Sequence, residues 1–190
     1  MSEADWLNST DPAAMLRSLI GRYSAQKRRG ETVDFERLRL FGCACCRRVW
    51  DLLDDDHHKS VELIEQYVRT PTPTGLVAAR RMRRAAGNQA GSEYDRLSRS
   101  VPRDRRACLA AWARNVASSA VWEAANKKPT KAANCHRSVA EAVHSIRLAE
   151  GATANGPDPG YIGYQLPSDG EMVAQARLLR EVVGNPFARM

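Results

Sequence analysis

The stretch that decides the fold of this chain reads Leu38-Arg39-Leu40-Phe41-Gly42-Cys43-Ala44-Cys45-Cys46-Arg47-Arg48-Val49-Trp50. At the spacing of an α-helix, the apolar side chains of this stretch and its flanks cover an arc of about 200°. An arc this wide is typical of a helix that is covered by neighbours on two or three sides. Asp34 can cap this helix, which we expect to run from Phe35 to about Leu53. Arg39 falls inside the apolar arc, so we expect it to pair with an acid in the interior or to extend to solvent.

Helical patterns continue along almost the whole chain. Further helices are predicted over residues 12–21, 59–69, 75–90, 104–126, 131–149 and 169–183. One of them, rich in alanine around Leu109, Trp112, Val116 and Trp122, suits close approach to a neighbouring helix. Convincing runs of alternating β-branched and aromatic residues, the signal of strands, do not occur. We therefore expect an all-α fold, a single-domain helical bundle of about six or seven helices over residues 1–190.

The segment 151–170 interrupts the helical pattern. It contains a turn-rich run of Gly, Pro, Asn and Asp, followed by Tyr161 and Tyr164. A loop of this length inside a compact domain tends to be functional or disordered. We expect a long surface loop that its tyrosines dock onto the helices, with ligand contact as the alternative.

The composition is that of an ordinary globular protein, with 43% hydrophobic and 27% charged residues. No apolar run approaches the roughly 20 residues of a membrane-spanning helix, and the acidic N-terminus lacks the order of a signal peptide. We therefore expect a cytoplasmic protein without membrane contact. Three of the five cysteines crowd between positions 43 and 46, which fits reduced thiols better than a disulfide framework.

The chain resembles a known family at both ends. The similar segments are Glu3-Ala4-Asp5-Trp6-Leu7, Asp11-Pro12 with Met15-Leu16, residues 37–50, the amphipathic residues 61–67, and Leu178-Leu179-Arg180-Glu181-Val182-Val183-Gly184-Asn185-Pro186-Phe187. Together they are similar to the N-terminal module of a large paralogous bacterial family of uncharacterised proteins. The similarity is loose between about 75 and 170. It implies kinship and no particular activity.

The crowded cysteines admit three interpretations. Cys43 and Cys46 lie about 60° apart on a helix, close enough to share a metal ion. Further ligands could come from residues elsewhere in the chain: Cys135, His136, His57 and His58. No C-x-x-C pair has a matching partner, so we expect buried structural thiols, with neither metal nor cofactor. A structural metal site, or a redox-sensing thiol with its pKa lowered by Arg47 and Arg48, is the alternative.

The run Asp54-Asp55-Asp56-His57-His58 could hold a divalent ion through carboxylate oxygens. We expect instead an exposed turn whose acids lie just ahead of the next helix, where the helix dipole favours negative charge. No G-x-S-x-G, P-loop, H-E-x-x-H or dinucleotide-binding pattern occurs. His136 and His144 likewise belong to no recognisable arrangement with a nucleophile and a carboxylate. The sequence therefore predicts a protein that is not an enzyme.

Basic residues give the strongest functional signal. Residues 61–137 hold fifteen basic and six acidic side chains, whereas the whole chain has a net charge of +7. The candidate polyanion-binding residues are Arg80, Arg81, Arg83, Arg84, Arg103, Arg105 and Arg106. The first four fall within about 160° of one helix face, an arrangement that can bind a phosphate backbone. No helix-turn-helix pattern or aromatic stacking platform accompanies them.

Two functional hypotheses follow. The leading one is a non-enzymatic module that binds an unknown protein partner through the 151–170 loop or the surroundings of the central helix. The alternative is weak, sequence-independent nucleic-acid binding through the arginine-rich face. The same helical phase predicts that Trp50 lies in the core and Arg47 on the surface.

Overall fold

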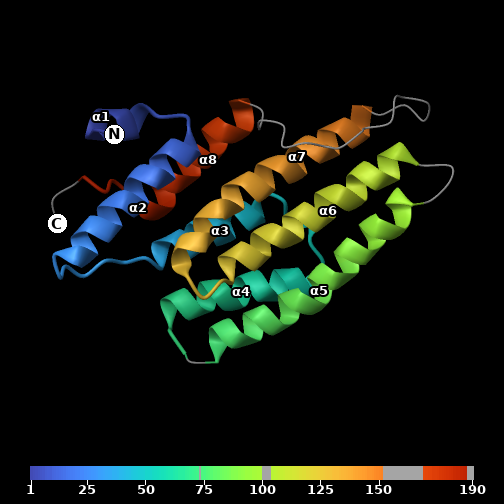
Figure 1. Cartoon of the computed structure of the whole chain (residues 1–190), viewed down its shortest axis with the longest axis horizontal. Coiled ribbons are helices and arrows are strands. Elements are labelled where there is room, and N and C mark those ends of the chain that lie inside the picture. Colours follow the sequence, from blue (N-terminus) through green and yellow to red (C-terminus); the bar gives the residue numbers. More distant parts are fainter. Residues whose placement is uncertain (73, 100–103, 152–168, 188–190) are drawn as a thin grey trace.

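The computed structural model describes residues 1–72, 74–99, 104–151 and 169–187 (Figure 1). These residues form eight α-helices and two short 3-10 helices, and they contain no strand. The α-helices are α1 (Glu3–Asn8), α2 (Pro12–Arg28), α3 (Arg37–Arg47), α4 (Asp55–Arg69), α5 (Gly75–Ser98), α6 (Arg105–Ala124), α7 (Cys135–Gly151) and α8 (Asp169–Val183). The 3-10 helices cover Trp50–Leu52 and Pro129–Asn134. The all-α prediction is confirmed. The additional helix is α1, which is too short to show a hydrophobic period.

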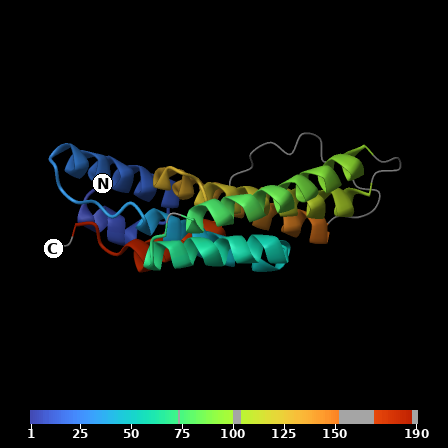
Figure 2. The ribbon, with the colours of Figure 1, turned by 90° about the horizontal axis from the view of Figure 1, so that it is seen from below.

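The helices α5, α6 and α7 lie side by side, each antiparallel to the one before (Figure 1). α3 packs against α4, α6, α7 and α8, and this contact set makes it the central helix of the bundle. α4 lies along α5, while α2 packs with α8. Seen from below, α5 and α6 extend beyond the end of α4 (Figure 2). The α5–α6 pair therefore has less cover than α3.

α3 carries the core, as its wide apolar arc predicts. Its buried apolar side chains are Leu38, Phe41, Cys43, Cys45 and Cys46. A Cβ on Gly42 would lie only 3.0 Å from Cys135 Sγ and 3.2 Å from Ala132 O. Glycine at position 42 therefore lets α3 approach the start of α7 more closely than any other residue would.

The central helix is shorter than predicted. It ends at Arg47, and the chain turns through the 3-10 helix at Trp50–Leu52 before α4 begins. Trp50 is consequently half-buried at the edge of the core instead of inside it. Its ring stacks on His58 with the ring centroids 3.9 Å apart, and the Arg47 guanidinium lies 4.1 Å from the Trp50 ring centroid. Arg47 is exposed, as predicted.

Other helix boundaries also differ from the prediction. α2 continues through Gly21, where the space around the missing Cβ is open, and α5 continues beyond position 90. α4 begins at Asp55 because the Asp54 carboxylate accepts a hydrogen bond from the backbone N–H of His57 at 2.9 Å and caps the helix. Residues 54–58 are thus the cap and first turn of α4, not a turn ahead of it, and His57 is buried.

None of the helices in the described ranges is both long and apolar enough to cross a membrane. The loop predicted over 151–170 lies almost entirely outside the described residues. At its borders, α7 ends at Gly151 and α8 begins at Asp169.

Candidate functional site

The carboxyl end of α6 is bound by a buried arginine of α3. Arg39 is 1% exposed, and its Nε donates a hydrogen bond to Glu36 Oε2 at 2.6 Å. Its guanidinium also donates to the carbonyl oxygens of Ala124 (3.0 Å), Asn126 and Lys127 (3.1 Å). The last carbonyls of a helix have no partner within the helix, so Arg39 satisfies them and complements the helix dipole. Of the two outcomes expected for Arg39, the structure has the interior ion pair.

Arg80 of α5 binds the same helix end. Its Nε donates to Ala125 O at 2.7 Å, and burial lowers the pKa of Arg80. This residue was predicted to face a polyanion, but its guanidinium holds α5 against the end of α6. The run of arginines at 80–84 therefore does not act as one uniform surface.

The other predicted polyanion-binding residues are placed in different parts of the α5–α6 pair. Those with exposed side chains are Arg81, Arg84 and Arg106. The side chains of Arg83 and Arg105, and all of Arg103, lie outside the described residues. Because α5 and α6 are antiparallel, Arg106 lies near the far end of α5, about 22 Å from Arg84 by the rise of an α-helix. The polyanion-binding surface stays a prediction. Among its exposed arginines, Arg81 and Arg84 lie closest to each other in the chain.

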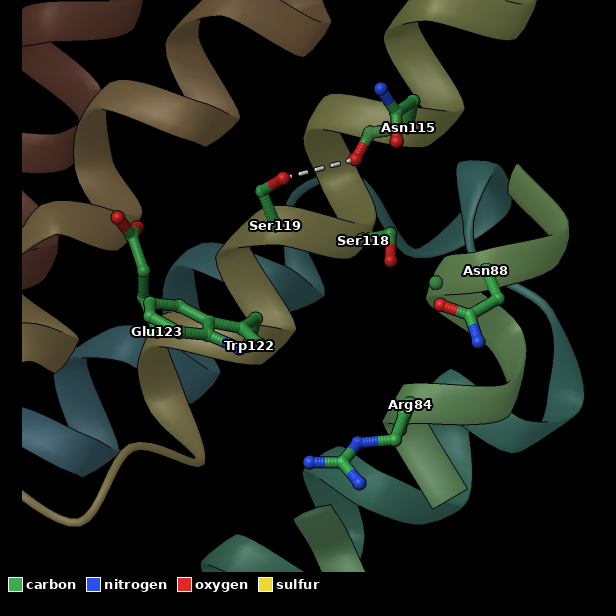
Figure 3. A pocket seen from close by; sticks show the side chains of 8 residues that line it. Arg84, Asn88, Asn115, Ser118, Ser119, Trp122 and Glu123 are labelled. Atoms are coloured by element: carbon green, nitrogen blue, oxygen red, sulfur yellow. Dashed lines mark hydrogen bonds between the residues drawn. The ribbon is translucent and has the colours of Figure 1, made fainter. Parts of the chain in front are cut away.

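A polar groove opens between α5 and α6 (Figure 3). Its volume is about 580 Å³. The lining residues are Arg84, Gly87 and Asn88 of α5, and Asn115, Ser118, Ser119, Trp122 and Glu123 of α6. A Cβ on Gly87 would lie 3.1 Å from Ser118 Oγ. Glycine at position 87 therefore keeps the two helices close while leaving room at the Ser118 hydroxyl.

Trp122 is the large apolar side chain of this groove. It is 43% exposed, although the pattern of α6 predicted a packing role for it together with Leu109, Trp112 and Val116. Leu109 and Val116 are buried as predicted, and Trp112 is half-buried, with its Nε1 donating to Glu141 Oε1 at 3.2 Å. Trp122 therefore lies on the face of α6 that borders the groove, while Leu109 and Val116 face the interior.

Glu123 forms one margin of the groove, and its carboxylate is turned away from Arg84 (Figure 3). Ser138 of α7 donates to its Oε2 at 3.3 Å. Burial raises the pKa of Glu123 to about 7. Its charge therefore changes close to neutral pH.

A hydrogen-bonded histidine lies behind the groove. His57 Nδ1 is 2.9 Å from Asp54 Oδ1, and His57 Nε2 is 2.7 Å from Ser118 Oγ. Burial lowers the pKa of His57, although the Asp54 carboxylate acts in the opposite direction. Sequence reasoning missed this group because Ser118 is 61 positions from His57. In the sequence, the only indication of this group is the spacing of Asp54 and His57. A helix cap and the residue three positions later lie close enough for their side chains to meet.

The cysteines are packed thiols. Four of them, Cys43, Cys45, Cys46 and Cys135, are buried, and Cys108 is partly exposed. Burial raises the pKa values of Cys43, Cys45 and Cys135 well above the ordinary range. Cys135 Sγ also donates to Ala120 O at 3.1 Å. Thiols in such surroundings stay protonated and react slowly, which does not favour a redox sensor.

The basic pair beside these cysteines is engaged with carboxylates. Arg47 pairs with Glu65 at 2.9 Å, and Arg48 pairs with Glu171 at 2.7 Å. Each guanidinium is therefore paired with a carboxylate and not with a thiolate. Among the residues that the structure describes, no three His, Cys, Asp or Glu side chains are grouped so that they could hold a metal ion.

Comparison of the chain with protein-family models, with curated proteins and with solved structures finds no match. The family resemblance at the two ends of the chain stays a prediction. The α5–α6 groove is therefore the basis of the functional proposal.

Proposed function

We propose that this protein is a helical interaction module that binds a short segment of a protein partner in the groove between α5 and α6. The exposure of Trp122 in the groove is the observation that carries this proposal. Large aromatic side chains bury wide apolar areas on binding and dominate the affinity of many protein interfaces. The other exposed large hydrophobic residues among those described, Met1, Leu7 and Val77, do not line the groove.

The polar lining indicates the chemistry of the segment. The Arg84 guanidinium favours an acidic side chain next to the residue that packs on Trp122. Asn88, Asn115 and Ser119 carry amide and hydroxyl groups that can pair with a peptide backbone. A volume of about 580 Å³ accommodates a few side chains of an extended segment, not a folded domain.

This site differs from the two that the sequence suggested. The apolar face of α3 belongs to the core, since Leu38, Phe41 and Cys45 are all 0% exposed. The 151–170 loop lies largely outside the described residues. The groove is the surface on which the interaction hypothesis can be tested residue by residue.

A peptide-display selection against the immobilised protein tests the proposal. We expect enriched peptides that combine an acidic residue with an aromatic or aliphatic one. Fluorescence anisotropy should then show that Trp122→Ala weakens their binding by about tenfold or more. Val77→Ala is the matched control, because Val77 is 53% exposed and lies outside the groove. A selection without enriched binders, or binders that Trp122→Ala leaves unaffected, would contradict the proposal.

Nucleic-acid binding is the second candidate, favoured by the exposure of Arg81 and Arg84 on α5. Arginines that neutralise neighbouring phosphates give an affinity that falls steeply with salt. If this candidate is right, combining Arg81→Glu with Arg84→Glu should abolish low-salt binding to a DNA duplex and leave the unfolding midpoint unchanged. Arg80 is excluded from the variant because it binds Ala125 O. Wild-type protein without low-salt affinity for duplex or single strands would eliminate the candidate.

A further inference from the structure

Asp54, His57 and Ser118 form a chain of hydrogen bonds from the start of α4 to the middle of α6. Asp54 Oδ1 lies 2.9 Å from His57 Nδ1 and also accepts from the His57 backbone N–H at 2.9 Å. The carboxylate is thereby fixed in position, and it requires a proton on Nδ1 of the neutral ring. Nε2 then carries the lone pair, which accepts the hydroxyl proton of Ser118 at an Nε2–Oγ distance of 2.7 Å.

Ser118 is bonded differently from Ser119 and Ser145. Ser60 and Ser138 also bond to another helix, but their partners are a carbonyl and a carboxylate oxygen, not an imidazole. Ser119 and Ser145 donate to the carbonyl oxygen four residues earlier, at 3.2 and 2.9 Å. This is the usual bond for a serine within a helix. The Ser118 hydroxyl instead meets His57 of another helix, and its side chain lines the groove opposite Asn88 (Figure 3).

We propose that Ser118 is the nucleophile of an acyl-transfer site in the α5–α6 groove, with His57 as its general base and Asp54 as the residue that positions His57. The substrate class is an ester of a small carboxylic acid. This activity goes beyond the binding of a partner segment and does not depend on it. A hydroxyl, an imidazole and a carboxylate at these distances are the set that activates serine in hydrolases of unrelated folds.

The reaction divides into two steps. Ser118 Oγ attacks the ester carbonyl carbon while its proton passes to His57 Nε2, and the imidazolium is stabilised by Asp54. The tetrahedral adduct then breaks its bond to the alcohol oxygen, which takes the proton from Nε2 and leaves. Water next attacks the acyl-Ser118 ester with His57 again as base, which releases the carboxylic acid and restores the hydroxyl.

Side chains that could stabilise the developing oxyanion border the same groove. Asn88 of α5 and Asn115 of α6 both belong to its lining, and their amide N–H groups are the type of donor used for this purpose. Figure 3 shows Asn88 across the groove from Ser118 and Asn115 one turn before it on α6. Arg84 lies farther along and suits a substrate with an anionic group.

The protonation state of His57 fits a base at neutral pH. The charged groups that act on it are Asp54 and Asp56, which raise its pKa, and His58, which lowers it. Burial outweighs them, so the pKa of His57 lies below its ordinary value. From α6, the facing group is the Ser118 hydroxyl. The ring is therefore neutral at pH 7 and able to accept the serine proton.

A fluorophosphonate probe tests the nucleophile, because it forms a stable Ser–O–P bond with loss of fluoride only at an activated serine. We expect one adduct per native chain, mapped to Ser118 by peptide mass spectrometry, and no adduct after denaturation. Ser118→Ala should abolish the adduct. Ser92→Ala, an exposed serine of α5 outside the groove, should leave the labelling rate unchanged. Mapping the adduct in the wild type keeps the test valid even if Ser118→Ala proves unstable.

The pH profile of labelling tests the role of Asp54. Asp54→Asn retains a good helix cap, so the far-UV circular dichroism spectrum and unfolding midpoint should be nearly unchanged. We expect the plateau labelling rate to fall by about tenfold or more, and the acid limb to move to lower pH because a charge that raises the pKa of His57 is gone. A purely structural cap would change neither the rate nor the limb.

Three results would overturn the proposal. They are no labelling of the native protein above that of the denatured chain, labelling at a residue other than Ser118, and labelling at Ser118 that Asp54→Asn leaves unchanged. The first two would show that the hydroxyl is only a packed partner of His57. The third would show that the carboxylate does not activate it.

Discussion

Arg80 and Arg84 lie one turn apart on α5, and they have opposite roles. Arg80 reaches into the fold and donates to Ala125 O at 2.7 Å, next to the buried Arg39. Arg84 is exposed and lines the groove with Trp122. The difference arises from what each meets on α6. At one end α5 faces the terminus of α6, whose last carbonyls have no partner within the helix, and one turn further it faces the polar side chains of an intact helix.

A run of arginines on one helix can therefore serve both structure and surface. The end of the α5–α6 pair that is bound by Arg80 and by Arg39 of α3 is closed by hydrogen bonds to carbonyl oxygens. The neighbouring section stays open because Gly87 presents no side chain and Asn88 and Ser119 are short. Substitutions in the two sections should therefore separate stability from binding.

The largest effect on stability is expected for Arg39→Ala. This change leaves three carbonyl oxygens near the end of α6 and the Glu36 carboxylate without their donor. Loss of one partner from a buried charged network should lower the free energy of unfolding by about 3 kcal/mol. Urea denaturation followed by circular dichroism measures it. A loss below about 1 kcal/mol would show that water replaces the guanidinium as the donor to these carbonyl oxygens. The end of α6 would then not be held by Arg39.

The next effect compares the two arginines of α5 directly. Arg80→Ala should cost about 1–2 kcal/mol, since it removes a bond to a helix-terminal carbonyl. Arg84→Ala should stay within about 0.5 kcal/mol of the wild type, as for most surface changes. Denaturation of the two variants under identical conditions gives the difference. Equal midpoints would remove the distinction between the closed and the open section.

A pH-dependent effect is expected at Glu123. Its pKa is about 7 in the fold, above the ordinary value near 4.5, so the folded protein binds the proton more tightly than the unfolded chain. The resulting stabilisation is present at low pH and is lost as pH rises from about 4.5 through 7. Glu123→Gln should therefore raise the melting temperature more at pH 8 than at pH 5. The same shift at both pH values would mean that Glu123 titrates normally.

The sequence predicted the scaffold better than the site. The apolar arc around Phe41 depends on residues close together in the chain, so helical periodicity alone places it at the centre. The helix ends are predicted less well: the range 12–21 ends at Gly21, whereas α2 continues to Arg28. Asp54 is predicted to lie in a turn ahead of the helix, whereas in the structure it caps α4.

The candidate site could not be predicted because it depends on which helices pack together. Trp122 lies about 140° around α6 from Leu109, so helical spacing separates the two faces but does not show which face a neighbouring helix covers; Leu109 is buried and Trp122 is exposed. Ser118 meets His57 only once α4 and α6 are neighbours. The run of arginines predicts one basic face of α5, but it does not show that Arg80 binds the carbonyl oxygen of Ala125.

The affinity of one selected peptide for two charge-reversed variants tests whether the open section of the α5–α6 pair is the binding surface. Arg84→Glu changes a groove residue, and Arg81→Glu makes the same change on an exposed residue that does not line the groove. We expect the dissociation constant to rise by about tenfold or more for Arg84→Glu and by less than about threefold for Arg81→Glu. Equal losses for the two variants would contradict the claim, because they would show that the peptide senses only the general basic charge of α5.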